Sequence, residues 1–117
     1  MVARRNLSSP SPTQWETLRF SDYVQRTQDS HNTISMGISS DGRIHLSYDH
    51  HDVPLNYRVS NAGVGLALDP GRYAWSPALF GGTVHGLPGV SGAWNSVTYP
   101  RFERFGDGLG MEMRNGA

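Results

Sequence analysis

The clearest pattern of hydrophobic and polar positions lies between residues 29 and 51, where two alternating runs flank an Asp-Gly pair. Asp-Gly between such runs is a strong short-range signal for a β-hairpin. A three-residue loop over 40–42, with its glycine in the left-handed region, places all the hydrophobic side chains on one face. The pairs on that face are Ile34–Tyr48, Met36–Leu46 and Ile38–Ile44. A two-residue loop would mix hydrophobic and polar side chains, so we predict the three-residue loop.

The opposite face of this predicted hairpin carries only small or polar side chains. Its pairs are Gly37–His45, Ser35–Ser47, Thr33–Asp49 and, at the open end, His31–His51. A solvated strand face more often carries Lys and Glu, and this face has neither. We therefore favour a lined cavity or channel with two histidines side by side. A solvent-exposed face with incidental histidines is the alternative.

Outside this hairpin the pattern divides the chain into further stretches. Residues 1–14 are rich in Ser and Pro and are predicted to be a mobile lead-in, and 15–24 a short strand or turn over the hairpin. The alternation over 55–60 predicts a third strand. Repeated Gly and Pro over 61–96 predict a loop-rich segment. Two short hydrophobic stretches, 78–80 and 92–94, are expected to anchor this segment to a core. Residues 97–114 form a second strand–Asp-Gly–strand unit, and such a repeat is typical of β-propeller blades.

In the second hairpin a two-residue loop is predicted to set Phe102 against Met113. Tyr99, Arg101 and Arg114 would then share the face away from the Phe and Met side chains. An alternative register, which Phe105 and Leu109 fit, stays open. The residue before a proline is restricted to extended backbone, and Tyr99 is followed by proline. We therefore expect an extended conformation there.

Composition narrows the class of protein. The 117 residues carry ten basic and ten acidic side chains, 14 Gly and 7 Pro, which is typical of one turn-rich all-β domain. Zero net charge disfavours nucleic acid and anionic membranes as partners, because both select a basic excess. The absence of Cys excludes disulfides and thiolate zinc sites within this chain. Neither a signal-peptide pattern nor a hydrophobic run near the ~20 residues of a membrane span occurs in it.

Four words of the sequence carry a resemblance to a known family. They are Asp-Ser-His-Asn-Thr-Ile at 29–34, Asp-Gly-Arg-Ile-His-Leu-Ser-Tyr-Asp-His-His at 41–51, Leu-Asn-Tyr-Arg at 55–58 and Thr-Tyr-Pro-Arg-Phe at 98–102. Together they resemble the BNR-repeat-containing propeller family that includes the ulvan lyases. The resemblance implies a seven-bladed β-propeller that cleaves an acidic polysaccharide by β-elimination at a uronic acid.

The resemblance also implies how this chain relates to a complete propeller. A blade takes ~40–50 residues, so we expect two to three blades here. Residues 1–28 would be a lead-in and partial blade, and 29–117 the blades of an incomplete domain. The implied partners are an acidic polysaccharide and the missing blades of the same parent protein, which we expect to be secreted or periplasmic. We expect the chain to be inactive by itself.

The same resemblance implies the residues of the site. The expected catalytic residues are His31, His51, Tyr99 and Arg114. The expected substrate-binding residues are Asp49, His50 and Arg101. In this chemistry a Tyr transfers the proton, while Arg and His neutralise the uronate carboxylate. The scheme requires no metal or other cofactor in this chain, and a metal in the missing part of the parent stays open.

Other assignments of the same residues remain open. His31, Asp49 and His51 could form a zinc site, since two imidazoles and a carboxylate suit that metal. His45 and His85 are expected to be structural, and His50 falls on the hydrophobic side of the predicted hairpin, where it would pack or replace His51. A related propeller glycoside hydrolase that uses a His, and a non-catalytic carbohydrate-binding piece, are the alternative functions.

Overall fold

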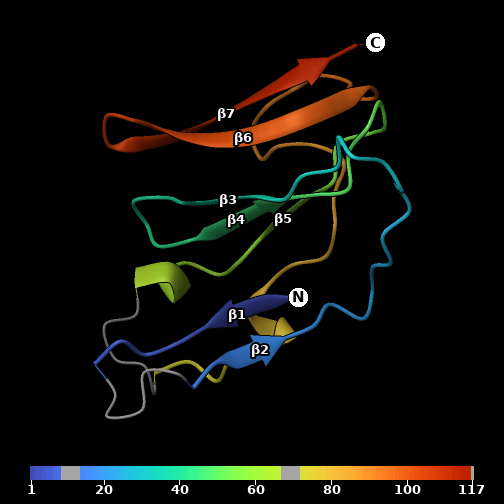
Figure 1. The fold of residues 1–117 in the computed structure, drawn as a ribbon. Coiled ribbons are helices and arrows are strands. Elements are labelled where there is room, and N and C mark those ends of the chain that lie inside the picture. Colours follow the sequence, from blue (N-terminus) through green and yellow to red (C-terminus); the bar gives the residue numbers. More distant parts are fainter. Residues whose placement is uncertain (9–13, 67–71, 117) are drawn as a thin grey trace.

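The computed structural model describes residues 1–8, 14–66 and 72–116, which form three small antiparallel sheets (Figure 1). The sheets consist of β1 (Val2–Arg4) with β2 (Glu16–Leu18), β3 (Ser35–Ile38) with β4 (Ile44–Ser47) and β5 (Tyr57–Val59), and β6 (Val97–Phe105) with β7 (Gly108–Asn115). They lie one above the other in the order of the sequence, as successive blades of a propeller would (Figure 1). The predicted all-β class is therefore confirmed.

The register of the central hairpin is the predicted one. The ladder pairs Met36 with Leu46 and Ile38 with Ile44, and it continues into β5 on the other side of β4. The Ser39 N–H donates to the Arg43 carbonyl at 3.0 Å, and Gly42 has a φ of 77°, as the three-residue loop requires.

The two halves of the hydrophobic face differ in burial. Ile44 and Leu46 on β4 are buried, whereas Ile34, Met36 and Ile38 are largely exposed. A hollow of about 400 Å³ beside Met36 and Leu46 separates this face from residues of the β1–β2 layer. The short first sheet thus covers β4 and leaves the β3 side open.

The second hairpin corrects the predicted register. Phe105 pairs with Gly108 across the Gly106-Asp107 turn, so Phe102 lies opposite Met111 and not Met113. The prediction was wrong by two residues, a shift that keeps every side chain on the same face. Phe102 therefore still packs in a core with both methionines. A bulge between Thr98 and Arg101 then changes the pairing at the end of β6.

The two hairpins approach each other closely. The Phe102 N–H donates to the Ser35 hydroxyl at 3.0 Å, which joins β6 to the start of β3. A side chain at Gly37 would lie 2.8 Å from the Phe102 Cβ, so only glycine permits this spacing. This contact fixes the second hairpin against the first, and both carry candidate site residues.

The N-terminal segment is more ordered than predicted. Val2–Arg4 form β1, which pairs with β2, so the lead-in prediction was wrong for these residues. The backbone hydrogen bonds of the pairing and the burial of Leu18 stabilise this sheet. Residues 9–13 of the predicted lead-in lie outside the described residues.

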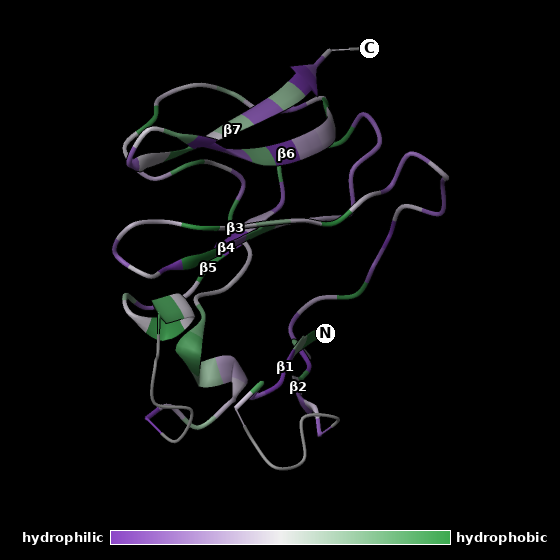
Figure 2. Ribbon diagram, turned by 60° about the vertical axis from the view of Figure 1, so that its left-hand side comes forward, coloured by the Kyte–Doolittle hydropathy of each residue, from purple (hydrophilic) through white to green (hydrophobic). Residues whose placement is uncertain are grey.

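The segment between 61 and 96 is loop-rich, as predicted. In its described part it contains two three-residue 3₁₀ helices, η1 (Val64–Leu66) and η2 (Pro77–Leu79), which Figure 2 shows as hydrophobic segments. No helix in the described part of the chain is long and hydrophobic enough to cross a membrane.

Two hydrophobic cores hold the layers together. The first comprises Leu18, Ile44, Leu46, Val64 and Phe80, and the second comprises Leu55, Tyr57 and Val97. Trp94 packs against the second core, so the predicted anchoring of the irregular segment is confirmed at both Phe80 and Trp94.

Candidate active site

His31 and His51 meet beyond the ends of the central hairpin. Their rings stack with centroids 4.5 Å apart and an interplanar angle of 22°. The sequence predicted them as a cross-strand pair, but the ladder ends at Ser35 and Ser47. Asp49 and Asp52 have φ values of 66° and 54°, and these left-handed residues turn the chain out of the strand. The two histidines are therefore neighbours through loop geometry and not through strand pairing.

One carboxylate holds both imidazoles. The Nδ1 atom of His31 contacts Oδ1 of Asp29, and Nδ1 of His51 lies 3.1 Å from Oδ2 of the same carboxylate. The backbone N–H of His31 also donates to Oδ1 at 2.8 Å, and this bond is the main cause of a lowered Asp29 pKa. Sequence reasoning assigned no role to Asp29. The sequence did contain a signal for this contact, the Asp-x-His spacing. An aspartate can accept a hydrogen bond from the backbone N–H of the residue two positions later.

Tyr99 and Arg114 complete the cluster from the second hairpin. The Tyr99 ring lies 5.7 Å from that of His31, and the Arg114 guanidinium carbon lies 5.5 Å from the Tyr99 ring centroid. In the β6–β7 ladder, Arg114 is paired with Thr98, the neighbour of Tyr99. The structure thus brings the four residues expected to be catalytic together.

The backbone at Tyr99 differs from the expectation. Its φ is 56°, in the left-handed region, whereas an extended conformation was predicted because a proline follows. The residue sits in the bulge of β6, which is where strands re-aim a side chain. Left-handed φ in a bulky residue is strained, and such strain is concentrated at functional sites.

The loop that carries His51 is tied to β6. The Asp52 N–H donates to the hydroxyl of the buried Thr98 at 2.8 Å, and the Ser96 hydroxyl contacts the Asp52 carboxylate. Val53 and Val97 exchange backbone hydrogen bonds in an isolated bridge. These contacts hold His51 and Tyr99 in one arrangement. The two are separated by 47 residues of chain, and most of these residues belong to the irregular segment.

Asp49 has a supporting position and not the predicted substrate contact. Its carboxylate is buried and accepts the Tyr23 hydroxyl at 2.5 Å and the N–H groups of Arg26 and Thr27 at 2.8 Å each. Burial acts to raise the pKa of Asp49, but these hydrogen bonds lower it below the usual value. Asn32 donates to the same carboxylate at 3.2 Å. Asp49 therefore pins the loop that carries Asp29 and His31, and it is not available as a zinc ligand.

The other two expected substrate contacts lie in different surroundings. His50 is fully buried, its Nε2 accepts the Asn56 N–H at 2.8 Å, and burial lowers its pKa to about 4. A fully buried imidazole cannot contact a polysaccharide, so His50 lies where a substrate cannot reach it in this structure. Arg101 is exposed on β6 with Glu112 at 3.7 Å, and it stays accessible to an anion.

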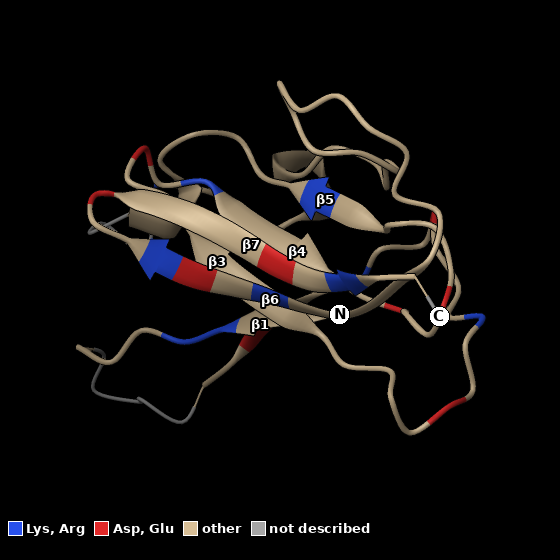
Figure 3. Ribbon diagram, turned by 90° about the horizontal axis from the view of Figure 1, so that it is seen from above, with Lys and Arg blue, Asp and Glu red and all other residues tan. Residues whose placement is uncertain are grey.

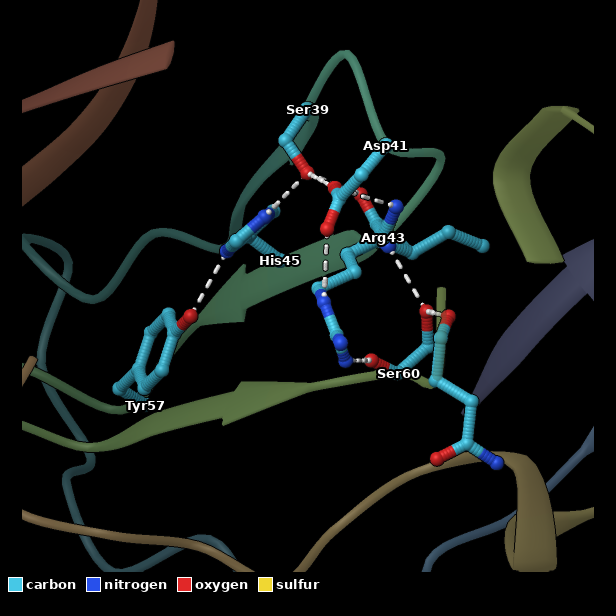
Figure 4. Close-up of polar contacts among 8 residues, drawn as sticks. Ser39, Asp41, Arg43, His45, Tyr57 and Ser60 are labelled. Atoms are coloured by element: carbon cyan, nitrogen blue, oxygen red, sulfur yellow. Dashed lines mark hydrogen bonds and ion pairs between the residues drawn. The ribbon is translucent and has the colours of Figure 1, made fainter. Parts of the chain in front are cut away.

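The remaining histidines are structural, as expected. His45 is held at Nδ1 by the Tyr57 hydroxyl at 2.7 Å and at Nε2 by the Ser39 hydroxyl at 2.9 Å (Figure 4). Burial lowers the pKa of His45. His85 Nδ1 donates to the Leu55 carbonyl at 2.8 Å.

The stacked histidines differ from these in having free ring edges. The side chains of Asp29, His31 and His51 are between 33% and 41% exposed. In the described part of the chain, the Nε2 atoms of His31 and His51 have no hydrogen-bond partner. The three side chains could also hold a metal, because their donor atoms lie within 4.8 Å of one another.

In the part of the chain that the structure describes, charged positions of both signs are mixed (Figure 3). Figure 3 shows acidic and basic positions interspersed along the strands and loops, which agrees with the zero net charge. Arg114 lies beside Tyr99, and Glu103 and Glu112 lie on the same two strands.

The sequence was compared with curated proteins and with models of protein families. No curated protein matches the sequence. The family model described as "BNR repeat-containing family member" matches residues 1–117. The chain therefore belongs to the BNR repeat-containing family.

Proposed function

We propose that this chain carries the catalytic residues of a polysaccharide lyase that cleaves uronic-acid-containing, ulvan-type polysaccharide by β-elimination. Membership of the BNR repeat-containing family supports the coarser statement, a carbohydrate-related propeller. The observation that favours a lyase is the cluster of His31, His51, Tyr99 and Arg114. Side chains from separate segments converge there, and each is of a type that this reaction uses.

In the proposed reaction Tyr99 transfers the proton. Its oxygen takes the proton from C5 of the uronic acid, and the C5–H electron pair forms the C4–C5 double bond. The C4–O4 bond breaks, and the Tyr99 hydroxyl formed in this way returns the proton to O4 as it leaves. The strained backbone at Tyr99 is consistent with a side chain held for this task.

The remaining residues would stabilise the charge that develops. Removing the C5 proton adds negative charge beside a carboxylate that is already anionic. Arg114 can donate two parallel hydrogen bonds to that carboxylate, and a protonated His31 or His51 can donate another. Arg101 would contact a neighbouring acidic sugar.

Replacing the Tyr99 hydroxyl tests the proposal. Tyr99→Phe should lower kcat by about 10²–10⁴-fold and leave KM nearly unchanged, because the ring stays and only proton transfer is lost. The assay is the ultraviolet absorbance of the unsaturated uronate, measured on the 117-residue chain and on any longer polypeptide that contains it. Tyr73→Phe is the matched control, since Tyr73 lies near β1 and its backbone carbonyl accepts from Arg4.

Two results would contradict this function. If Tyr99→Phe kept more than about a tenth of the parental rate, Tyr99 would not be the proton-transfer group. New reducing ends without the ultraviolet signal would identify hydrolysis in place of elimination.

A further inference from the structure

The contact between Asp29 and the two stacked histidines determines more than their distance apart. Both imidazoles present the same atom, Nδ1, to one carboxylate. Asp29 precedes His31 by two residues, and the His31 N–H also donates to it. The carboxylate is therefore fixed to the backbone of one histidine and reaches across to the other.

This arrangement selects a tautomer for both rings. An ionised carboxylate only accepts hydrogen bonds, so the His31 Nδ1 that is hydrogen-bonded to it must carry a proton. The His51 Nδ1 lies 3.1 Å from the same carboxylate as an ion-pair contact, and the negative charge there favours a proton over a lone pair on this nitrogen. A neutral imidazole has one N–H, and its Nε2 atom is then left with a lone pair. Because the Asp29 pKa is lowered, the carboxylate is ionised at neutral pH.

The rings also share charge with Asp29. Two protonated imidazoles with centroids 4.5 Å apart would repel each other, but one protonated ring and the carboxylate together are neutral. In that state one Nε2 donates a hydrogen bond and the other accepts one. Tyr99 is the titratable group that faces His31 from β6, and Arg114 lies beyond it.

We propose that Asp29 is a positioning residue of this site, which holds His31 and His51 in the Nδ1–H tautomer and leaves both Nε2 atoms for the substrate. The inference rests on the proposed function for what the Nε2 atoms bind, a uronate carboxylate and a transferring proton. The tautomers themselves are a property of the protein alone, so this part of the inference is independent of the proposed function. The two can therefore be tested separately.

Long-range ¹H–¹⁵N correlation spectra of the full chain read the tautomers directly. At about pH 9, above the usual imidazole range near 6.5, we expect the Nδ1–H pattern for both histidines. In Asp29→Asn the amide offers its carbonyl oxygen to one ring and its NH₂ group to the other, so at least one ring should switch to Nε2–H. Asp29→Glu keeps the carboxylate and should keep both Nδ1–H patterns.

Asp41→Asn is the matched control. Asp41 is an exposed aspartate in the turn of the same hairpin, where it accepts from Ser39 and Arg43 (Figure 4). It is at the opposite end of the hairpin from His31 and His51, so their tautomers should be unchanged. His85, whose Nδ1 donates to Leu55, serves as an internal reference for the Nδ1–H pattern.

The activity of the same variants gives the second readout. Asp29→Asn should lower kcat about 10- to 100-fold with KM little changed, which is the range seen when the partner behind a functional histidine is removed. Asp29→Glu should restore most of the rate, and Asp41→Asn should have no effect.

Three outcomes would overturn the proposal. One is an Nε2–H pattern for both histidines in the parent chain, and another is an unchanged pattern in Asp29→Asn. The third is stoichiometric Zn²⁺ binding that requires Asp29, which would make the three residues a metal site. Nδ1–H patterns without any lyase activity, both in this chain and in a longer polypeptide that contains it, would instead count against the proposed function and leave the role of Asp29 supported.

Discussion

His31 and His51 stack with their ring centroids 4.5 Å apart, although neither residue lies in a strand. The β3–β4 ladder brings their loops to the same end of the sheet, and Asp29 joins the two rings there. The pair therefore depends on tertiary contacts between two loops, which begin at the same end of the β3–β4 ladder.

We expect His31 and His51 to act as a unit. His31→Gln and His51→Gln should each lower kcat/KM by about 10²–10⁴-fold if a proton or a charged hydrogen bond is lost. The double variant should be little worse than either single one, because groups that act together are non-additive. Losses that simply multiply in the lyase assay would show that the histidines work independently.

Removing the Asp49 charge should loosen the loop that carries Asp29 and His31. Asp49→Asn keeps the shape, but its NH₂ group replaces one of the two oxygens that accept the N–H groups of Arg26 and Thr27, so one of these two bonds is lost. We expect a loss of about 1–3 kcal/mol in the free energy of unfolding, as for buried donors left unpaired. Urea unfolding measures this loss, and hydrogen exchange should be faster at whichever of Arg26 and Thr27 loses its acceptor.

The control for Asp49 is an exposed aspartate in the second turn. Asp107→Asn changes the same charge in the loop between β6 and β7 and should leave stability unchanged within about 0.5 kcal/mol. Equal effects of the two substitutions would contradict the role given to Asp49.

His50 should make the fold sensitive to mild acid. Burial lowers its pKa to about 4, below the unfolded value near 6.5, so the unfolded state binds the proton more readily. The free energy of unfolding is unaffected by this group above about pH 6.5. It falls as the pH falls toward 4, by about 3 kcal/mol at most. Thermal melts across this range should show the midpoint falling with pH.

His50→Gln tests the assignment to this group. Its side-chain oxygen can still accept the Asn56 N–H, but it has no proton to gain in this range. The melting temperature of the variant should therefore depend less on pH between about 4 and 6.5. An unchanged pH dependence would assign the acid sensitivity to another group.

The sequence alone determined the strands and the register of the central hairpin. The alternation from Met36 to Leu46 and the Asp-Gly turn are local, and one register keeps the hydrophobic side chains together. The family resemblance named four residues that the structure brings together, and their catalytic role stays a prediction. The loop-rich character of 61–96 was also readable, because Gly and Pro act locally.

Only the tertiary structure decided the rest. The shared carboxylate of Asp29, the burial of His50 and the use of Asp49 as a loop anchor depend on contacts between distant segments. The left-handed backbone of Tyr99 arises from a bulge that the local preference before proline opposes. Local propensities amount to about 1 kcal/mol, and the packing of two hairpins through Gly37 and Phe102 outweighs them.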